Sequence, residues 1–476
     1  MIHAKKLLCL LIALVAVFTV YSQNVFPLKT SADGRYLVDR NNKPFPILGR
    51  TAWFIITQSE SGYKQFLSNT LAHGHNAVEM AVITHWPTGN HAPYTAAGQA
   101  PFLKTLNGRN WDGTLTYNDI NMEGPDLLTP NEAYWQFVDS FLSYCEDQGI
   151  LVLMFPGYTG YNGGEQGWLQ ELVANGPQKC EAYGAWIAAR FKNRPNIIWM
   201  LLGDMGKFNA AQQQAEAALI KGLKSVPGQL STEYTAESFS GQNAADNETF
   251  GHEMTMNASY TWELGVPVPF IARKAYEHTP VMPSFLLEEP YDEEGPDGNN
   301  YNPNATQPVR RFQWWGWLST IGGYMSGNGY VWPFIDPVWQ FHLNTQAAMD
   351  MARLNGFIKA IDWWKLIPSG LGGMKNLITA GNSSDTSAAY VAAAAAGDGS
   401  LLLAYIPPAH SGSITIDMSV LKGKVYAAWF DPAIGSYTSA AEGSLPASGS
   451  RTFTPPGKNM AGDTDWVLIL STKQVH

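Results

Sequence analysis

The feature that most constrains this chain is a repeated alternation of short apolar segments with helical segments across residues 45–325. Apolar runs of about four to eight residues indicate buried β-strands, whereas apolar residues at helical spacing, as in residues 131–149, indicate amphipathic α-helices. Strands that alternate with helices assemble into a parallel sheet, because each helix returns the chain to the start of the next strand. Eight strands are expected, at residues 45–48, 77–83, 150–155, 197–202, 232–236, 254–258, 281–287 and 322–325.

Eight strand–helix repeats predict an α/β fold of the (β/α)8 TIM-barrel type. A doubly wound open sheet is the runner-up, but the sequence has no glycine-rich dinucleotide fingerprint of the kind that such sheets carry. Segment 30–45 predicts an antiparallel hairpin in front of the barrel, with turns at Asp33-Gly34 and Asn41-Asn42. We therefore assign residues 23–372 to a barrel domain with an N-terminal hairpin.

Beyond residue 369 the sequence pattern changes. Segment 370–387 is rich in Gly, Ser and polar residues and predicts a linker. We expect the tail to dock on the barrel, because Trp363 and Trp364 at the junction would otherwise expose apolar surface. The tail predicts a small C-terminal antiparallel β-sandwich over residues 385–476, with strands at 388–396, 401–407, 413–418, 424–430 and 465–471.

The first 22 residues have the layout of a secretory signal peptide. Lys5 and Lys6 precede an apolar run at 7–20, and the small residue Ser22 follows it. We therefore expect a secreted or periplasmic protein. We expect no integral membrane span once the signal is removed, because no other stretch is long and apolar enough. The sequence does not indicate the oligomeric state.

Charge and motif content exclude several classes of ligand. A formal net charge of −10 disfavours nucleic acid, whose phosphates need clustered Lys and Arg. We expect no metal and no cofactor, because the sequence has neither His/Cys clusters at zinc spacing nor a glycine-rich phosphate loop. Cys145 and Cys180 both fall in predicted helices, and the sequence leaves open whether they pair.

Two of the predicted strands end in acidic residues. Asp204 follows the fourth strand, and Glu288 and Glu289 follow the seventh. In barrel enzymes the chemistry lies at the C-terminal ends of the strands. Glycoside hydrolysis needs such a pair, one carboxylic acid that protonates the leaving oxygen and one carboxylate on the opposite face of the sugar. Because neighbours along a strand face opposite sides, we expect only one of the two glutamates to face the pocket.

Aromatic and polar residues follow the other strands and predict a sugar pocket with aromatic walls. The candidates for substrate binding are Arg50, Trp53, His85, Glu237, Asn257, Tyr260, Tyr291 and Trp332. The expected partner is an oligosaccharide or polysaccharide. The guanidinium of Arg50 would pair either with the carboxylate of an acidic sugar or with a neighbouring acidic side chain, and the sequence leaves both open.

Several stretches resemble the apiosidase-like glycoside hydrolases and the domain that commonly follows them. Residues 28–53, which end in GRTAW, resemble the opening of that family, and NIIWMLLGD at 196–204 resembles its strand-four acid motif. LLEEPYDEE at 286–294 and the aromatic segment 308–334 resemble its strand-seven and strand-eight region. The tail, with GDGSLLLAYIP, WFDPAIG and DWVLILS, resembles a collagen-binding domain. The resemblance covers nearly the whole mature chain.

This resemblance implies a retaining, exo-acting enzyme on plant-type glycan side chains, with apiose-containing side chains of pectin as the substrate class. It implies an acid/base at Asp204 and a nucleophile at Glu288 when Tyr291 anchors the E-x-x-Y motif, whereas the glutamate–proline pair would select Glu289. We favour Glu288. Arg50 departs from the family pattern, where an Asp is common, and segments 155–161 and 235–238 depart as well. The identity of the sugar therefore stays open.

A second class of function is a non-catalytic glycan- or matrix-binding protein that keeps the barrel. A purely binding protein has no need of two acids at opposed strand ends. The acids at residue 204 and at 288 or 289 therefore favour the enzyme.

Overall fold

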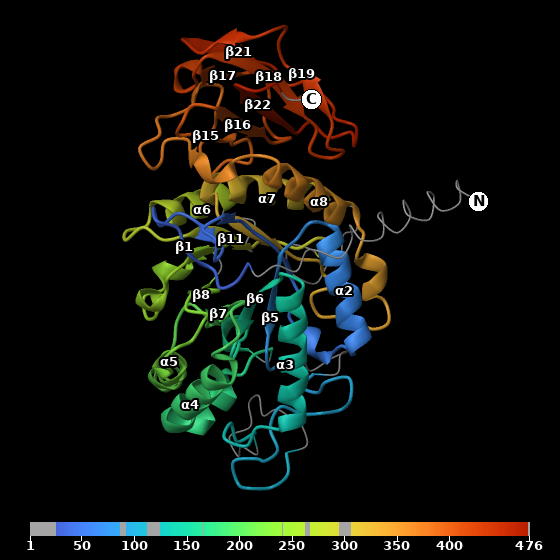
Figure 1. Cartoon of the computed structure of the whole chain (residues 1–476), viewed down its shortest axis with the longest axis vertical. Helices are drawn as coiled ribbons and strands as arrows, with labels where there is room; N and C mark the ends of the chain where they lie inside the picture. Colours follow the sequence, from blue (N-terminus) through green and yellow to red (C-terminus); the bar gives the residue numbers. More distant parts are fainter. Residues whose placement is uncertain are drawn as a thin grey trace, which may run out of the picture.

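The computed structural model describes residues 25–85, 92–111, 124–164, 166–239, 241–261, 267–294 and 306–474. The predicted signal peptide, residues 1–22, lies outside these ranges. Figure 1 shows a part in which helices surround a sheet, and a tail of β-strands that lies against one side of it. Among the described residues, no helix combines the length and the apolar character that crossing a bilayer requires.

A small antiparallel sheet precedes the barrel strands. It consists of β1 (Lys29–Thr30), β2 (Leu37–Val38) and β3 (Pro44–Phe45), in that order. The predicted hairpin is therefore a three-stranded sheet, because each of the two turn pairs reverses the chain. Gly34 and Asn42 supply the left-handed backbone for these turns, with φ of 76° and 61°. Since Phe45 belongs to β3, the first barrel strand begins two residues later than predicted.

All eight predicted barrel strands are present, with shifted bounds. Parallel hydrogen bonding joins them in the order β8-β7-β6-β5-β4-β12-β11-β10, and the short strand β9 (Gln242–Asn243) pairs antiparallel with β10. The backbone N–H groups of Thr255 and Met256 donate to the carbonyl oxygen of Tyr234 at 2.9 and 3.1 Å, so the two ends of this path meet. The described residues thus form an α/β barrel with a mixed sheet. Its strands are β4 (Ile47–Thr51), β5 (Ala77–Ala81), β6 (Leu151–Phe155), β7 (Ile197–Leu201), β8 (Tyr234–Ala236), β10 (Asn257–Tyr260), β11 (Ser284–Glu288) and β12 (Gly323–Ser326).

Seven α-helices among the described residues pack around this sheet. Short polar side chains begin several of them: Ser59, Asn131, Asn209 and Thr345 each accept a backbone N–H of the first turn. Cys145 and Cys180 are buried in two of the helices as free thiols, so they do not pair. The helices are α2 (Glu60–Ala72), α3 (Glu132–Asp147), α4 (Leu169–Phe191), α5 (Ala210–Ser225), α6 (Val268–Glu277), α7 (Thr306–Thr320) and α8 (Gln346–Lys359).

The fifth strand–helix repeat differs from the prediction. Between β8 and β10 the described residues, 237–239 and 241–256, form only β9 and the short 3-10 turns η3 (Ala244–Asp246) and η4 (Gly251–Glu253). This stretch is rich in Ser, Gly, Asn and Asp, whose side chains or backbone freedom favour turns over helices. The expectation of a helix after every strand is therefore wrong at this position.

The tail consists of two packed antiparallel sheets. Segment 370–387, predicted as a linker, contains β14, which pairs with β17 because Leu377 and Ile378 are buried in the core between the sheets. The linker prediction is therefore wrong there. One sheet contains β13 (Leu366–Pro368), β15 (Ala392–Ala396), β16 (Leu401–Ile406), β18 (Lys424–Phe430), β19 (Tyr437–Ser439), β20 (Leu445–Pro446) and β22 (Trp466–Ser471), and the other β14 (Ile378–Ala380), β17 (Ile414–Asp417) and β21 (Ser450–Phe453).

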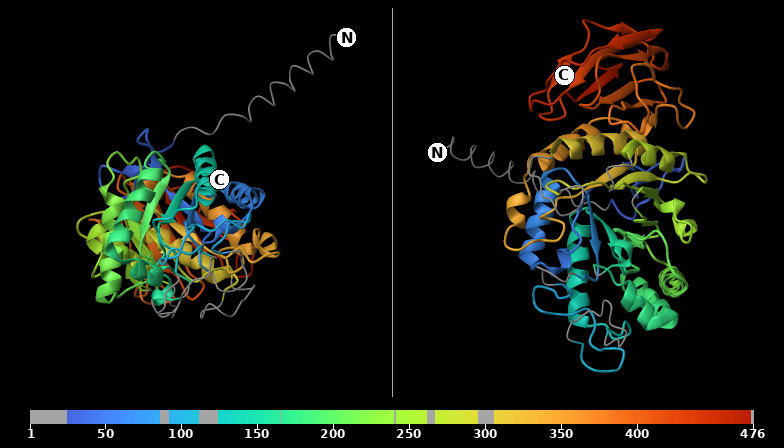
Figure 2. Two further views of the ribbon diagram at one scale, coloured as in Figure 1. Left: turned by 90° about the horizontal axis from the view of Figure 1, so that it is seen from below. Right: turned by 180° about the vertical axis from the view of Figure 1, so that it is seen from behind.

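The tail docks on the barrel through an aromatic interface, as expected. Trp314 of α7 and Tyr405 of β16 stack with their ring centroids 5.8 Å apart and their planes 4° from parallel. Trp363 at the junction is only 2% exposed, and Tyr36 of the N-terminal sheet packs against its edge. In Figure 1 and in the view from behind in Figure 2, helices α7 and α8 separate the tail from the barrel strands.

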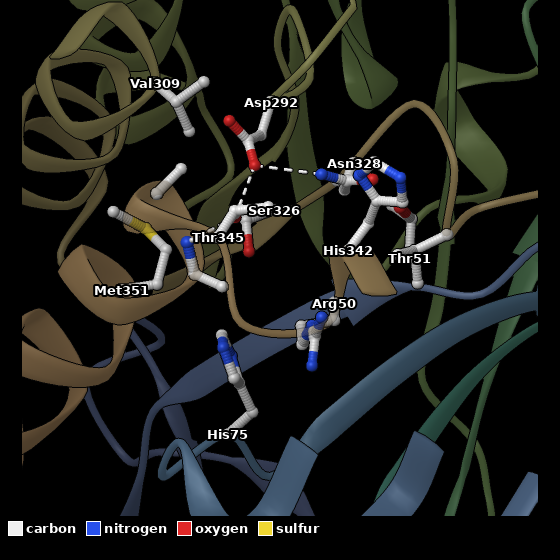
Figure 3. Close-up of a pocket in the computed structure, with 14 residues that line it drawn as sticks. Arg50, Thr51, His75, Asp292, Val309, Ser326, Asn328, His342, Thr345 and Met351 are labelled. Atoms are coloured by element: carbon white, nitrogen blue, oxygen red, sulfur yellow. Dashed lines mark hydrogen bonds between the residues drawn. The ribbon is translucent and has the colours of Figure 1, made fainter. Parts of the chain in front are cut away.

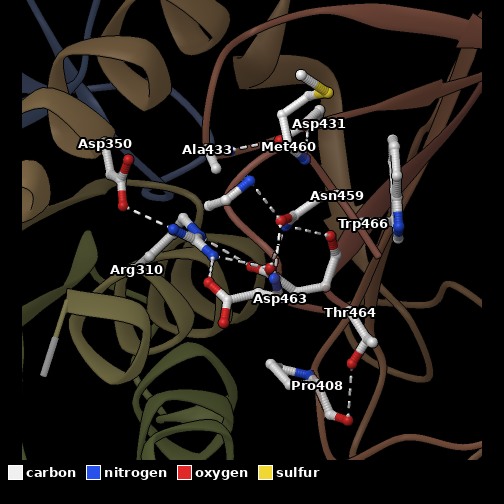
Figure 4. A network of polar contacts seen from close by, with 12 residues as sticks. Arg310, Asp350, Pro408, Asp431, Ala433, Asn459, Met460, Asp463, Thr464 and Trp466 are labelled. Atoms are coloured by element: carbon white, nitrogen blue, oxygen red, sulfur yellow. Dashed lines mark hydrogen bonds and ion pairs between the residues drawn. The ribbon is translucent and has the colours of Figure 1, made fainter. Parts of the chain in front are cut away.

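A buried ion network reinforces this interface (Figure 4). Arg310 of α7, which is 1% exposed, donates to both carboxylate oxygens of Asp465 at 2.8 and 2.9 Å and to Asp350 of α8 at 2.7 Å. Asp463 accepts from the same guanidinium at 2.8 Å, and the hydroxyl of Tyr405 donates to Asp465 at 2.9 Å. The guanidinium of Arg310 is compensated in part by two carboxylates of the tail, Asp463 and Asp465. Separating the tail from α7 would remove these partners and leave buried charges uncompensated.

Candidate active site

Three acidic side chains gather at the C-terminal ends of the barrel strands. They are Asp204 after β7, Glu237 after β8 and Glu288 at the end of β11. One carboxylate oxygen from each lies within 4.8 Å of one from each of the others, and all three side chains are buried. Asp204 and Glu288 were both predicted as catalytic, and Glu237 was predicted as a substrate contact. The fold brings all three into one cluster.

Asp204 reaches this cluster through a strained backbone conformation. Its φ of 54° lies in the left-handed region, which is unfavourable for a residue with a side chain and is often found at functional sites. Gly203 has no side chain, and a Cβ there would lie 2.1 Å from the ring of Tyr158. The close approach lets the Tyr158 hydroxyl donate to Asp204 Oδ2 at 2.6 Å. Tyr260 of β10 also hydrogen-bonds to this carboxylate.

Glu288 and Glu289 face different neighbours. The hydroxyl of Tyr291 hydrogen-bonds to Glu288, and Trp53 Nε1 donates to that hydroxyl oxygen at 3.1 Å. Glu289 instead accepts a hydrogen bond from the side-chain amide of Gln313 on α7. Glu288 therefore belongs to the acid cluster with Asp204, and Glu289 lies behind it against the helix layer. Leu286 faces the same helix layer, and a register shift between Leu286 and Glu288 interrupts the alternation, so that Glu288 faces the cluster.

Burial dominates the electrostatics of the cluster. It raises the pKa of Asp204 to about 6, against the hydrogen bonds from Tyr158 and Tyr260, which favour the ionised carboxylate. Burial also raises the pKa of Glu288 well above its usual range, and the negative charges of Asp204 and Glu79 raise it further. Two acids at this distance cannot both ionise cheaply, so near neutral pH they favour a state that keeps one proton.

Glu79 was not predicted from the sequence. It lies in the middle of β5, is 0% exposed, and neither carboxylate oxygen has a hydrogen-bond partner among the residues that the structure describes. Burial, followed by the charge of Asp204, raises its pKa well above the usual range. The sequence does contain an indication of Glu79, because a single acid inside the apolar run 77–83 would not stabilise a buried strand and therefore points to a functional role. Tyr158 was also missed, since a tyrosine after a strand is common in cores.

Several predicted pocket residues lie beside the cluster. The ring of Trp53 packs on Phe155 and Tyr158, with centroids 5.0 and 4.8 Å apart. Tyr260 and Tyr291 bond to the acids as described. Trp332 lies further out, where its Nε1 donates to Glu294 at 3.3 Å. His85 is buried, which lowers its pKa to about 4, and residues 86–91 after it lie outside the described ranges.

Asn257 does not reach the cluster. It is the first residue of β10, at the opposite end of the strand from Tyr260. Its side-chain oxygen accepts from the backbone N–H of Ala245 at 2.9 Å, and its amide donates to the carbonyl of Ala275 at 3.4 Å. The sequence placed this strand about three residues too early, and Asn257 therefore holds loops together at the N-terminal side of the barrel.

Arg50 also lies apart from the acid cluster. It falls within β4, and its side chain points to α2, where it donates to Asn69 at 2.7 Å and lies 5.1 Å from the ring centre of Phe66. It lines a small cavity of about 20 Å³ together with His75, Asp292 and other residues of the β4–β12 side, and neither Asp204 nor Glu288 lines it (Figure 3). Arg50 was predicted to follow the strand as a sugar contact, but it lies within β4, and the alternation of the strand turns its side chain outward to α2, away from the acid cluster.

The cluster can perform two kinds of chemistry. Carboxylate oxygens this close can bind a divalent cation such as Ca²⁺. They can also act as the acid and nucleophile of glycoside hydrolysis, for which a separation of about 5–5.5 Å suits a retaining mechanism. Tyr158 and Tyr260 donate to Asp204, and Tyr291 donates to Glu288, which keeps these two carboxylates in a set orientation.

Comparison with known proteins identifies the family. Residues 31–365 match the sequence model of a family described as "Apiosidase-like, catalytic domain", and residues 375–471 match one described as "Putative collagen-binding domain of a collagenase". No curated protein sequence matches the chain. One similar solved structure is described as "Glycoside hydrolase": it is 18% identical, with a TM-score of 0.73 over 95% of this chain and 100% of that one. A glycoside hydrolase family 5 protein from Bacteroides vulgatus is 21% identical, with a TM-score of 0.73 over 94% and 93% of the two chains.

Proposed function

Because the chain belongs to the apiosidase-like family of glycoside hydrolases, we propose that it is an exported, retaining, exo-acting glycosidase. Its proposed substrates are the side chains of plant-type glycans, with apiose-containing side chains of pectin as the first class to test. The proposal includes a fully closed eight-stranded barrel. The hydrogen bonds from Thr255 and Met256 to Tyr234 support that closure.

In this proposal Asp204 is the acid/base and Glu288 is the nucleophile. Asp204 protonates the leaving glycosidic oxygen while a Glu288 oxygen attacks the anomeric carbon, which forms a covalent glycosyl–enzyme and releases the alcohol. Asp204 then removes a proton from a water that displaces Glu288. The supporting observation is the approach of Asp204 and Glu288 oxygens within 4.8 Å, which is closer to the carboxyl separation of about 5–5.5 Å in retaining enzymes than to the about 6.5–9.5 Å of inverting ones.

Glu237 is proposed to bind hydroxyl groups of the sugar. Both of its oxygens lack hydrogen-bond partners among the described residues although the side chain is 0% exposed, so a ligand hydroxyl would satisfy them. Four further acids, Glu79, Asp204, Glu288 and Glu289, are buried at or behind the same site. The negative charge that Glu288 carries as the nucleophile would repel a sugar carboxylate, and Arg50 faces away. We therefore withdraw the acidic-sugar hypothesis and propose a neutral sugar.

Single substitutions of Asp204, Glu288 and Glu289 test the proposal on a panel of neutral aryl glycosides. Glu288→Ala should abolish turnover on every substrate, and added azide should partly restore it with inversion at the anomeric carbon. Asp204→Ala should lose about 10²–10⁴-fold on poor leaving groups, but much less on activated ones that need no proton. Glu289→Ala is the matched control for the neighbouring acid and should keep measurable turnover.

Three results would count against this assignment. Loss of activity in Glu289→Ala with retention in Glu288→Ala would reverse the roles of the two glutamates. Activity in both variants would reject the two-carboxylate mechanism. An azide product of retained configuration would reject Glu288 as the nucleophile.

A further inference from the structure

Helix α7 packs directly on the strand that carries Glu288. The amide of Gln313 donates to the carboxylate of Glu289 and, at 3.0 Å, to the carbonyl of Met325 on the next strand. One turn further on, a Cβ at Gly316 would lie 2.4 Å from the side chain of Leu286, so the helix backbone rests against β11 without an intervening side chain. These contacts fix α7 relative to the end of β11.

The opposite face of the same helix contacts the tail. Besides the stacking of Trp314 on Tyr405, the indole N–H of Trp315 donates to the carbonyl of Tyr390 at 2.9 Å. Arg310, one turn before Gln313, is held by Asp465 of the tail. Within residues 310–316 of α7, the residues that contact the tail (310, 314 and 315) therefore alternate with those that contact β11 or the residue after it (313 and 316).

We propose that the tail takes part in catalysis by holding α7 in place, and that Gln313 and Glu289 are positioning residues for Glu288. Glu289 follows Glu288 directly, so the contact that holds its side chain also sets the last peptide of β11. Reacting groups displaced by about 1 Å lose on the order of 100-fold in rate. A domain that holds α7 in place can therefore control turnover, although the acid cluster of the described residues contains no residue of the tail. This inference rests on the proposed role of Glu288 as nucleophile.

The ion network between Arg310 and the tail makes the docking of the tail on α7 cooperative. A small shift of the tail would break charge-assisted bonds between Arg310 and Asp465 in a site that is almost inaccessible to water. Buried ion pairs of this kind resist partial separation, because an uncompensated buried charge costs several kcal/mol. The tail therefore holds α7 in one position, and an intermediate docking geometry is disfavoured.

The first arm of the test compares two buried amides. Gln313→Leu removes the donor to Glu289, and Asn196→Leu is the control, because Asn196 is also 0% exposed and donates to two backbone carbonyls, those of Leu142 and Ile150, away from the acids. Turnover is measured in the full chain per folded enzyme, counted by a burst with a mechanism-based inhibitor. Gln313→Leu should lower kcat by about 10- to 100-fold with KM changed by less than about twofold. Asn196→Leu should lower Tm and leave kcat nearly unchanged.

The second arm tests the tail. Tyr405→Leu removes the ring that stacks on α7, and Phe453→Leu is the matched control, because Phe453 lies in the core between the two tail sheets. Tyr405→Leu should lower kcat, whereas Phe453→Leu should lower only Tm. In the double variant, Tyr405→Leu should lower kcat much less than it does alone, because Gln313→Leu has already removed the contact through which both substitutions act. Trp315→Phe, which removes the indole hydrogen bond to the tail and makes a buried ring smaller, replaces Tyr405→Leu if that variant does not fold.

The outcomes separate this inference from the proposed function. Wild-type enzyme that hydrolyses aryl glycosides, together with an inactive Glu288→Ala, establishes the premise. If Gln313→Leu then keeps wild-type kcat, or if Tyr405→Leu and Phe453→Leu change kcat equally, the tail is only a stabilising domain and the inference is wrong. If the wild type hydrolyses no glycoside, the proposed function fails first.

Discussion

Replacing Tyr158 by Phe should move the pH dependence of turnover in a defined direction. The Tyr158 hydroxyl donates to Asp204 at 2.6 Å, and the pKa of the buried Asp204 is about 6 with this bond in place. A hydrogen bond to a charged group contributes about 1.5–3 kcal/mol, and each pKa unit corresponds to about 1.4 kcal/mol. Losing the bond destabilises the ionised form, so the pKa of Asp204 should rise by about one to two units.

Because the leaving group needs protonated Asp204, the basic limb of kcat/KM should move up by the same one to two pH units. The assay is a pH–rate profile on two aryl glycosides, one with a poor and one with an activated leaving group, and only the poor one should show the shift. Tyr183→Phe is the control, since that buried hydroxyl donates to the backbone carbonyl of Pro156, at 2.8 Å. A basic limb that stays in place or moves down in Tyr158→Phe would refute the reasoning.

Two further predictions concern Asp204 and Arg50. The folded-state pKa of Asp204, about 6, lies above its usual value of 3.8, so its contribution to stability is full below pH 3.8 and is lost as pH rises through 6. Asp204→Asn should therefore raise the free energy of unfolding at pH 7 by up to about 3 kcal/mol, with no gain near pH 3.5 by urea denaturation; a loss at pH 7 would contradict this. Arg50→Leu should lower Tm, because it removes the bond to Asn69 and the contact with Phe66, and it should leave the ratio of kcat/KM on neutral and acidic aryl glycosides unchanged. A loss of kcat/KM on the acidic glycoside alone would show that Arg50 contacts the sugar.

The proposed catalytic acids could be predicted from the sequence, because the pattern that indicates them is local. A buried parallel strand is an apolar run, and an acid directly after it can only lie at the mouth of the barrel. Asp204 and Glu288 satisfy this rule, and Glu237 does so after the shorter strand β8. Glu79 follows a different rule, since it lies within its strand, and a search limited to strand ends could not find it.

Errors in strand bounds produced the errors in the site. The apolar run before Arg50 includes Phe45, which belongs to the N-terminal sheet, so the strand was placed early and Arg50 was assigned to the loop after it instead of to the strand. Asn257 was placed at the end of a strand that in fact begins there. A shift of one residue reverses the facing of every side chain in a strand, and apolar content alone does not set the register.

The order of the barrel strands, the two-part organisation and the acids at the ends of β7 and β11 could be predicted from the sequence, because each of these depends on patterns within a few residues. Which side chains converge could not be predicted in this way. The α/β-barrel fold brings Glu237 and Glu79 toward Asp204, and the outward turn of Glu289 brings it to Gln313 on α7. Contacts between residues far apart in the chain depend on register, crossing geometry and packing, none of which leaves a trace in a single stretch of sequence.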